Sequence, residues 1–460
     1  MADQKLYEQY NPWWQGGQIP ADFRFKTKRR LFEKLIADID NKKIISVVGL
    51  RRIGKSVLLY QIIEHLLDRG VDPRRIFYLK ADDPVIEIEK NIISDAVDFY
   101  ENVISHQRLD KTKERVYFFF DEGQKVSKWG EYLKRYFDLG YQIKFFITGS
   151  SSVQIIKTSK ESLAGRSKEY VLPPLSFSEL FSWKGKSQLS KIEPDKIFDY
   201  QEWVEKIDKL SQELNLQTSD IEELLKDYFS KGGFPVLYFE SENPYEYIKN
   251  EVVERVIKRD IPEVTGIRNS VLLQQILILI AKESGNIFSL REMSRKLGIN
   301  FETVASYLFY LEESFLLTIL RKYARGGYPQ AKTMPKIHIS DVGILSVASG
   351  LREQSWLDPT LLGHTVEGLV ANTLNFSFPE LNVFFWRDKI GEVDVILERG
   401  KQTLPIEVKY QNQALKSQLT YLDNFQAKYK SPFSLVITKQ KLKVESNRIF
   451  VPLWLFLLLI

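Results

Sequence analysis

Short apolar runs alternate with segments of helical hydrophobic spacing along the first third of the chain. The predicted strands are Ile44–Val48, 75–79, 116–120 and 144–147. The predicted helices between them include 57–67 and 92–104. Buried strands that alternate with amphipathic helices are typical of an α/β fold with a parallel sheet. The pattern therefore predicts an α/β domain at the start of the chain.

The first apolar run continues into residues 49–56, which read GLRRIGKS and fit G-x-x-x-x-G-K-[ST] between a strand and a helix. Gly49 lets the loop turn back, Gly54 lets the backbone approach a phosphate, and the N–H groups at the helix start direct positive charge toward it. Lys55 is expected to reach the outer phosphates and the Ser56 hydroxyl to ligate Mg²⁺. The sequence thus predicts a nucleoside triphosphate site. Its contacts are predicted at Gly49, Arg51, Arg52, Ile53, Gly54, Lys55, Ser56 and Val57.

Two carboxylates, Asp121 and Glu122, directly follow the apolar run 116–120. In a parallel sheet this places them at the carboxyl edge, beside the phosphate loop. Asp121 is expected to hold Mg²⁺ through water, and Glu122 to orient or deprotonate the attacking water. A strand that simply ends in an acidic turn is the alternative.

The next apolar run, 144–147, ends in the sequence TGSSS. A hydroxyl at this strand end can sense the γ-phosphate through water, and Ser150 is the residue that we assign to this contact. The alternative is an ordinary Ser/Gly loop.

Composition narrows the function classes. The 65 Lys and Arg exceed the 60 Asp and Glu, and the net charge of +5 permits nucleic-acid contact without requiring it. The chain has no cysteine, which excludes disulfides, thiolate catalysis and Cys-ligated zinc. Its 4 histidines are scattered and show no metal-ligand spacing. A length of 460 residues, 44% hydrophobic and 27% charged, is that of a globular protein with about three domains.

The two ends of the chain give no sign of a membrane-spanning segment. Residues 1–10 are polar and lack the apolar core of a signal peptide. The apolar run 451–460 is far shorter than the roughly 20 residues that span a bilayer. We expect a buried closing segment there, a membrane-touching tail being the alternative, and we expect the aromatic turn at 11–14 to dock on the nucleotide-binding domain. These features predict a cytoplasmic protein without membrane contact.

Five motifs occur in the order GLRRIGKS, FFFDE, FFITGSS, LAGR and LPPLSFSEL. In this order the chain resembles archaeal and bacterial AAA-type ATPases (AAA_14 type) that carry a C-terminal DUF4143 region. The resemblance implies an α/β P-loop NTPase domain with a parallel sheet and a helical lid, followed by a winged helix and a restriction-endonuclease-like α/β domain. It implies ATP rather than GTP, and it makes Arg166 a candidate γ-phosphate contact, in cis or from a neighbouring subunit, against the alternative of a surface arginine. The implied domains are 1–175 for the ATPase, 176–265 for the lid, 266–332 for the winged helix and 333–460 for the nuclease-like domain.

The segment that we interpret as the lid is rich in Lys, Glu, Ser and Leu. It shows helical spacing at 221–229 and ends in the breaker sequence KGGFP at 231–235. An amphipathic helix predicted at 250–260 would bridge to the next domain.

Residues 271–325 have the pattern of a winged helix. An apolar helix at 271–281 is followed by a second helix that begins with Ser289 as its cap, and Asn300 caps a third helix at 301–311. Two capped helices separated by a short turn are typical of helix-turn-helix spacing.

A strand at 315–320 and a basic tip at 321–327 would form the wing. The cations expected to contact DNA phosphates are Lys296, Arg321, Lys322 and Arg325. The third helix and its end carry Glu302, Glu312 and Glu313 and no Arg or Lys, which argues against direct base reading. A winged helix that makes only protein contacts is therefore the alternative to DNA binding.

Near the C-terminus, a helix pattern carrying Glu367 precedes three strand patterns. The helix is 366–375, and the strands are 383–386, 392–397 and 404–409, the last two joined as a hairpin through 398–401. Alternation along the last strand puts Glu407 and Lys409 on the same face, and Asp394 can reach the same end of the sheet.

This arrangement resembles the PD-(D/E)xK nuclease constellation, in which carboxylates hold Mg²⁺ across a phosphodiester and a lysine helps activate water. The implied metal ligands are Glu367, Asp394 and Glu407, with Lys409 as the activating lysine. Val393 stands where the motif name has proline. Glu392 matches no motif position but shares a strand face with Asp394. An inert nuclease-like fold used for packing or binding is the alternative.

Together these features predict a Mg²⁺-dependent ATPase that couples ATP binding and hydrolysis to a nucleic-acid-binding C-terminal domain, nucleolytic if its site is active. The expected partners are ATP, DNA, and a protein partner or further copies of the chain. Two alternatives stay open: a nucleotide-dependent switch with an inactive nuclease fold that acts through protein contacts, and a winged-helix DNA-binding regulator. The predicted catalytic residues are Lys55, Glu122, Arg166, Asp394, Glu407 and Lys409.

Overall fold

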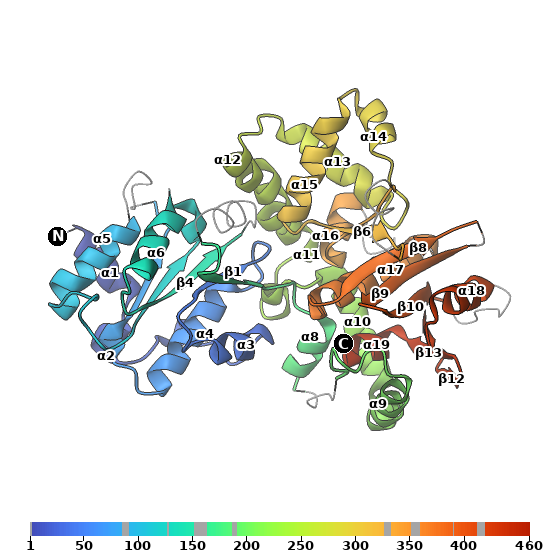
Figure 1. The fold of residues 1–460 in the computed structure, drawn as a ribbon, viewed down its shortest axis with the longest axis horizontal. Helices are drawn as coiled ribbons and strands as arrows, with labels where there is room; N and C mark the ends of the chain where they lie inside the picture. Colours follow the sequence, from blue (N-terminus) through green and yellow to red (C-terminus); the bar gives the residue numbers. More distant parts are fainter. Residues whose placement is uncertain are drawn as a thin grey trace. The chain divides into compact units, whose positions relative to one another are not determined.

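The computed structural model describes residues 2–84, 92–126, 128–150, 163–185, 191–325, 333–350, 359–389, 391–411 and 419–460 (Figure 1). The chain divides into two compact units. The first comprises Met1–Pro173 and Glu263–Gly266, and the second comprises Pro174–Pro262 and Ile267–Ile460. Each unit is built around its own sheet.

The first unit contains a five-stranded sheet. Its strands are β1 (Ile44–Val48), β2 (Ile76–Lys80), β3 (Val116–Asp121), β4 (Ile143–Gly149) and β5 (Ser167–Val171). They lie in the order β2-β3-β4-β1-β5, and every neighbouring pair is parallel. The four predicted strands and the predicted α/β fold class are confirmed. The edge strand β5 is additional, because its sequence SKEYV offers no apolar run.

Helices cover both faces of this sheet. α3 (Leu31–Ala37) packs beside α4 (Lys55–Asp68), and α5 (Ile92–Phe99) packs beside α6 (Trp129–Asp138). Figure 1 shows the two pairs on opposite faces. The predicted helix at 92–104 continues beyond α5 as a π-helical segment, Tyr100–Ser105. Because both faces are covered, β1 and β3 are buried along their whole length.

The N-terminal segment docks on the edge strand β2, as expected for its aromatic turn. It forms α1 (Ala2–Tyr10) and α2 (Trp13–Gly16). The indole N–H groups of Trp13 and Trp14 donate to the carbonyl of Ile76, at 3.0 and 2.8 Å. The Asn11 amide donates to the carbonyl of Tyr78 at 2.9 Å. These bonds occupy polar groups that an edge strand would otherwise expose.

The second unit contains an eight-stranded mixed sheet in the order β12-β13-β11-β10-β9-β8-β6-β7. The predicted hairpin between β9 and β10 is confirmed. Arg321 and Lys322, predicted in the wing tip, lie in β6, and they pair in register with Phe384 and Phe385 of β8. The strands are β6 (Leu317–Lys322), β7 (Lys336–Ile339), β8 (Asn382–Arg387), β9 (Glu392–Arg399), β10 (Gln402–Lys409), β11 (Ser434–Thr438), β12 (Lys443–Glu445) and β13 (Arg448–Pro452).

One face of this sheet shares a large apolar core with several helices. They include α8 (Phe177–Trp183), α9 (Tyr200–Glu213), α10 (Thr218–Lys231), α17 (Pro359–Ser377) and α19 (Leu453–Leu459). Trp203 of α9 stacks on Phe456 of α19 with ring centroids 6.3 Å apart. The segment 176–265, predicted as a lid, therefore contributes helices to the core of the C-terminal sheet. The shorter elements of this unit are α11 (Pro244–Tyr247), α16 (Val342–Ser349) and the π-helical segments Ile248–Val253 and Val256–Asp260.

The closing segment is buried, as expected from its apolar sequence: every residue of α19 lies in the core. Among the described residues, no helix combines the length and the apolar character that crossing a membrane requires.

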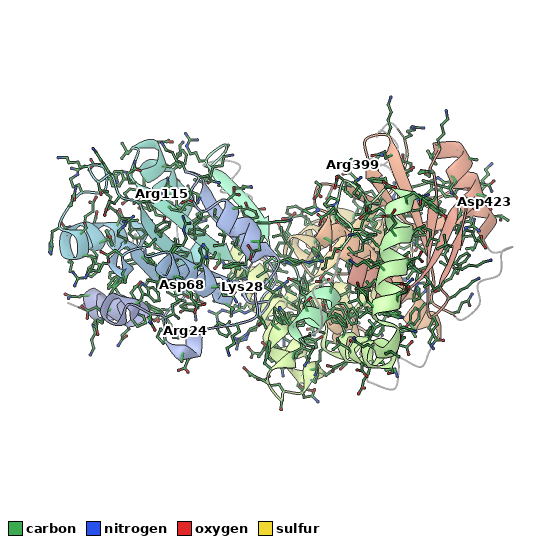
Figure 2. The ribbon with its side chains drawn as sticks, turned by 90° about the horizontal axis from the view of Figure 1, so that it is seen from below. Arg24, Lys28, Asp68, Arg115, Arg399 and Asp423 are labelled. Carbon is green, nitrogen blue, oxygen red and sulfur yellow. The ribbon has the colours of Figure 1, made fainter. Side chains whose placement is uncertain are left out.

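Two charged residues labelled in Figure 2 connect this sheet to the segments packed on it, Arg399 to a turn ahead of α9 and Asp423 to a helix. Arg399, at the end of β9, donates to the carbonyls of Pro194 and Asp195 at 3.3 and 3.1 Å. Asp423 belongs to α18 (Thr420–Tyr429), which covers the other face of the sheet. Its carboxylate pairs with Arg448 of β13 at 2.6 Å.

The region predicted as a winged helix contains three helices and a hairpin. The helices are α13 (Ser270–Lys282), α14 (Leu290–Leu297) and α15 (Phe301–Glu313). The predicted caps are present: the Ser289 hydroxyl accepts the Glu292 N–H at 3.3 Å, and the Asn300 amide oxygen accepts the Thr303 N–H at 2.7 Å. β6 and β7 pair antiparallel, and residues 326 and 327 of the predicted wing tip lie outside the described residues.

Candidate functional site

The predicted phosphate loop joins β1 to α4, and its two glycines are required for different reasons. A Cβ on Gly49 would lie 2.3 Å from the carbonyl oxygen of Leu172, which directly follows β5. Only glycine therefore fits beside the end of β5. Gly54 has a φ of +96°, which side chains other than glycine rarely adopt, while a Cβ there would meet no atom closer than 3.9 Å. The loop is therefore packed against the sheet on one side and open at Gly54, where a phosphate is expected.

Lys55 begins α4 and is almost completely buried. Its ammonium donates to the carbonyls of Gly49 and Leu50, both at 3.1 Å, and lies 3.9 Å from the carboxylate of Glu122. Burial alone would raise the pKa of Glu122, but Lys55 and then the Gln124 amide outweigh it and hold that pKa below its usual value. Glu122 is thus ionised at neutral pH, the state that accepting a proton requires.

Asp121 ends β3 and is buried. It accepts hydrogen bonds from the hydroxyls of Ser56, Thr148 and Tyr78. Burial, followed by the charge of Glu122, raises the pKa of Asp121, and the three hydroxyls oppose that rise. The two predicted Mg²⁺ ligands, Ser56 and Asp121, are therefore in contact. Their oxygens and the open loop beside them fit a hydrated Mg²⁺ and a nucleotide phosphate.

Thr148 is a residue of the nucleotide site that the sequence analysis did not assign. β4 lies between β1 and β3, so the end of β4 comes between the phosphate loop and the acidic pair. The Thr148 hydroxyl donates to Asp121 and accepts the backbone N–H of Glu122 at 2.9 Å. Ser150, the predicted sensor, is buried directly after β4. The sequence signal for Thr148 was a hydroxyl inside the predicted strand, two positions before Ser150.

Arg29 lies outside the phosphate-loop motif but also contacts the loop. Its guanidinium donates to the carbonyl of Ile53 in the loop at 3.0 Å and to that of Pro173 at 2.7 Å. The Arg29 side chain is buried, and its two hydrogen bonds hold the phosphate loop next to the segment that precedes α3.

The structure does not bring Arg166 to the phosphate loop. Its carbonyl accepts the N–H of Ile44 at 2.9 Å, which places it at the start of β1, about 15 Å of strand away from the loop. Its guanidinium pairs with Asp138 at 2.6 Å. A contact from Arg166 to the γ-phosphate of the same chain does not fit this placement, and a contact from a neighbouring subunit stays a prediction.

The predicted C-terminal motif lies on the antiparallel strands β9 and β10. One carboxylate oxygen of Asp394 accepts the N–H of Val408 at 2.9 Å. Glu407 is buried, pairs with Lys409 and accepts the hydroxyl of Tyr421 at 2.5 Å. Burial, followed by the charge of Asp394, raises the pKa of Glu407 to about 8. Glu407 and Lys409 lie on the same strand face, as expected, and the structure adds an ion pair between them.

A buried lysine that the sequence analysis missed lies at the centre of this site. Lys336 begins β7 and is 2% exposed. Its ammonium lies 2.6 Å from a carboxylate oxygen of Glu367 on α17, 2.5 Å from one of Glu392 and 3.5 Å from one of Asp394 on β9. Its signal in the sequence was weak: one cation in a strand of alternating Ile residues.

The predicted metal ligands do not fit a divalent ion in this arrangement. Glu367 and Asp394 turn toward Lys336, whereas Glu407 turns toward Lys409 and Tyr421. Within the described part of the chain, no group of three His, Asp or Glu side chains is free to hold a metal ion as the residues stand.

A basic and aromatic pocket lies beside the end of β6. Its volume is about 210 Å³, and one wall is formed by residues of β6 that include the predicted DNA contact Lys322. The other predicted cations are exposed, and Lys296 pairs with Glu283 at 2.9 Å. The pocket is lined by Lys322, Tyr323, Ala324, Thr333, Trp386, Arg387, Asp388, Lys428 and Tyr429.

Three segments of the chain match described protein families. Residues 41–181 match the AAA domain, 222–355 match a domain of unknown function (DUF8612), and 362–456 match a domain of unknown function (DUF4143). Together with the parallel sheet and its phosphate loop, the first match identifies an AAA-type P-loop domain that binds nucleotide. The last match places a DUF4143 region at residues 362–456.

Relatives of similar length occur in bacteria and archaea. An uncharacterized protein of Haemophilus influenzae is 25% identical over 385 residues, which cover 81% of this chain and 84% of the relative. An uncharacterized protein of Methanocaldococcus jannaschii is 25% identical over 428 residues, 92% of this chain and 86% of the relative. Among solved structures, Cdc6p from Pyrobaculum aerophilum matches 76% of this chain and 99% of that chain, at 14% identity and a TM-score of 0.30. AMPPCP-bound DnaA from Aquifex aeolicus matches 63% of this chain and 89% of that chain, at 14% identity and a TM-score of 0.25.

Proposed function

We propose that this protein is a Mg²⁺-dependent ATPase whose hydrolysis cycle is coupled to nucleic-acid binding by its second unit. The observation that carries the ATPase proposal is the contact network of Lys55, Ser56, Asp121 and Glu122. It joins a phosphate-binding cation, two oxygen donors for a metal and an ionised glutamate. This is the set of groups that γ-phosphoryl transfer to water requires.

In the proposed reaction, Lys55 exchanges its bonds to Gly49 and Leu50 for the outer phosphates of ATP. Glu122 accepts a proton from water as the water oxygen bonds to the γ-phosphorus, and the bond from that phosphorus to the β–γ bridging oxygen breaks. Ser56 and Asp121 would hold Mg²⁺, which supplies charge neutralisation at the β- and γ-phosphates. Thr148 keeps Asp121 and the backbone of Glu122 in place during these steps.

The basic pocket beside β6 supports a nucleic-acid partner. Lysine and arginine side chains bind phosphates, and tyrosine and tryptophan rings can stack on unpaired bases. Lys322, Arg387 and Lys428 supply cations here, beside the rings of Tyr323 and Trp386. The combination favours binding of a single-stranded or distorted segment at this edge.

Cleavage of nucleic acid is not part of the proposal. The carboxylates predicted as metal ligands face Lys336 rather than a common open centre. This observation favours the alternative in which the nuclease-like domain acts by binding alone.

The test is ATP hydrolysis by the full chain, measured with and without single-stranded and duplex DNA. We expect slow Mg²⁺-dependent turnover that nucleic acid changes several-fold. Lys55→Ala should abolish nucleotide binding, while Lys42→Ala, an exposed lysine ahead of β1, should have no effect. Turnover that survives in Lys55→Ala would contradict the ATPase proposal, and turnover indifferent to every nucleic acid would contradict the coupling.

A further inference from the structure

The C-terminal carboxylate cluster contains its own cation. The Lys336 ammonium lies among Glu367, Glu392 and Asp394, which come from α17 and β9. Lys336 is 2% exposed, so water does not compensate its charge. An ammonium has three N–H donors, and here three carboxylates surround it. The carboxylates therefore supply the charge that permits this lysine to be buried.

The ammonium fills the space between the three carboxylates, where a metal ion bound by the same oxygens would have to lie. Oxygen ligands surround Mg²⁺ at about 2.0–2.1 Å and Ca²⁺ at about 2.3–2.6 Å. The ammonium lies 2.6 Å from Glu367 and 2.5 Å from Glu392. A divalent ion on the same oxygens would overlap the Lys336 nitrogen and repel its charge. Lysine and metal are therefore mutually exclusive occupants.

The remaining groups of the predicted nuclease motif are also bound to neighbouring protein groups. One oxygen of Asp394 accepts the N–H of Val408 at 2.9 Å, and the other faces Lys336. Glu407 directs one oxygen to both Lys409 and Tyr421, and its other oxygen is buried without a hydrogen-bond partner among the described residues. Lys409 is thereby held by Glu407. The carboxylates do not share an open centre.

We propose that the Lys336 ammonium is the resident cation of this carboxylate site and excludes divalent metal ions from it. Metal-dependent cleavage at this site is then blocked by a side chain of the domain itself. Removal of the ammonium should leave Glu367, Glu392 and Asp394 without a cation and convert the cluster into a site for Mn²⁺ or Mg²⁺. The proposal does not depend on the ATPase function.

The test is a Mn²⁺ titration of the full chain without nucleotide, followed by the electron paramagnetic resonance signal of free Mn²⁺. All proteins carry Asp121→Asn, which removes the predicted metal-holding carboxylate of the nucleotide site. We expect this background protein to bind no Mn²⁺ at the C-terminal site up to about 1 mM Mn²⁺. Adding Lys336→Met should create a site for one Mn²⁺ ion with a dissociation constant at least about tenfold below that concentration. Adding Asp394→Asn to Lys336→Met should remove that ion. Lys296→Met, an exposed lysine that pairs with Glu283, is the matched control and should gain nothing.

Two results would overturn the proposal. One is tight Mn²⁺ binding by the background protein that disappears with Asp394→Asn. The other is a folded Lys336→Met protein, judged by circular dichroism, that gains no ion. If Lys336→Met does not fold, the proposal is tested instead by the thermal unfolding midpoint of the background protein with and without Mn²⁺. An ion that binds only the folded state raises this midpoint. A midpoint unchanged by Mn²⁺ supports the proposal, and a rise that requires Asp394 contradicts it.

Discussion

The hydroxyl of Thr148 donates a hydrogen bond to the carboxylate of Asp121, and it accepts the N–H of the following residue, Glu122, at 2.9 Å. One side chain on β4 thus fixes both acidic residues at the end of β3. Glu122 has a φ of 53°, in the left-handed region that few residues other than glycine adopt, and the Thr148 bond holds it there. Thr148 therefore sets where the carboxylate of Glu122 lies relative to Lys55.

Replacement of Thr148 by valine keeps the shape of the side chain and removes both bonds. We expect Thr148→Val to lower the rate constant for ATP hydrolysis by about 10- to 100-fold, because partners that orient a metal-holding carboxylate typically contribute that much. ATP affinity should change little, since the loop and Lys55 are untouched. Steady-state hydrolysis and equilibrium binding of a fluorescent ATP analogue measure the two quantities separately.

Thr148→Ser is the matched control for that substitution. It keeps the hydroxyl, so its rate should stay within about threefold of the original. Equal losses in the serine and valine variants would show that packing, rather than hydrogen bonding, explains the effect.

The second prediction concerns the carboxylate of Glu122 itself. Glu122→Gln should lower turnover by about 10²- to 10⁴-fold, the usual contribution of a general base, and it should leave ATP bound. Rapid gel filtration after incubation with ATP should then recover unhydrolysed nucleotide with the protein. Glu131→Gln, on the exposed side of α6, is the control and should hydrolyse ATP normally. Unchanged turnover in Glu122→Gln would remove this residue from the mechanism.

The nucleotide site was predictable from the sequence because its parts are local. Gly49 to Ser56 form one contiguous loop, and Asp121 and Glu122 follow a strand whose apolar run is unmistakable. Each segment carries its own chemistry, and the parallel sheet brings the strand ends together.

Thr148, Arg29 and Lys336 could not be assigned in this way. Their roles depend on strand order and on residues distant in sequence: Thr148 needs β4 to lie between β1 and β3, and Lys336 needs β7 to lie near α17 and β9. Hydrophobic periodicity specifies that a strand is buried but not which strands are its neighbours. The same limit applies to β5, an edge strand whose polar sequence gives no period-2 signal.

The third prediction is a pH dependence of stability in the second unit. Burial, followed by the charge of Glu313, raises the pKa of Glu312 to about 7, against the opposing effect of Arg321. The folded-state pKa of Glu312 exceeds its unfolded value of about 4.3. The contribution of Glu312 to folding stability is therefore fully present below about pH 4.3. Its contribution is lost as the pH rises toward 7, where the native state must ionise a half-buried carboxyl.

Glu312→Gln removes that ionisation. Urea unfolding should show a gain of about 1–3 kcal/mol at pH 8 and no gain at pH 4.5. Glu302→Gln, exposed in the same helix, should leave the pH profile of stability unchanged. An equal gain at both pH values would mean that ionisation of Glu312 is not the cause.

The fourth prediction concerns Asp341, which caps α16. Its carboxylate accepts the N–H of Gly233 at 2.8 Å and that of Gly343 at 2.8 Å, and it is buried. Asp341→Asn places an amide N–H₂ against one of these donors, so unfolding free energy should fall by about 2–3 kcal/mol. Asp199→Asn, at an exposed cap of α9, should cost only a few tenths of a kcal/mol. Equal losses, measured by urea unfolding, would show that the Gly233 bond is unimportant.

The last prediction tests whether the β6 edge binds nucleic acid. Arg321, Lys322 and Arg325 are exposed or half-buried, and Lys322 lines the pocket. Arg321 and Lys322 lie in β6 rather than in a loop, so their backbone positions are fixed by pairing with β8. Their replacement by glutamate should leave the fold intact. Removing one cation that neutralises a phosphate lowers the slope of log affinity against log salt concentration by about 0.9 for duplex DNA and about 0.7 for single strands.

For the triple charge reversal we therefore expect the slope to fall by about 2–3, with a smaller fall for single strands if the same cations are used. Fluorescence anisotropy of labelled DNA at several salt concentrations gives this slope. Lys401→Glu is the control, because Lys401 is exposed in the β9–β10 turn, at the opposite end of β9 from the pocket residue Arg387 and its partner Glu392. An unchanged slope in the triple variant would exclude the β6 edge as the binding surface and would favour protein contacts for this region. A reduced slope would place the nucleic acid across β6 and the pocket.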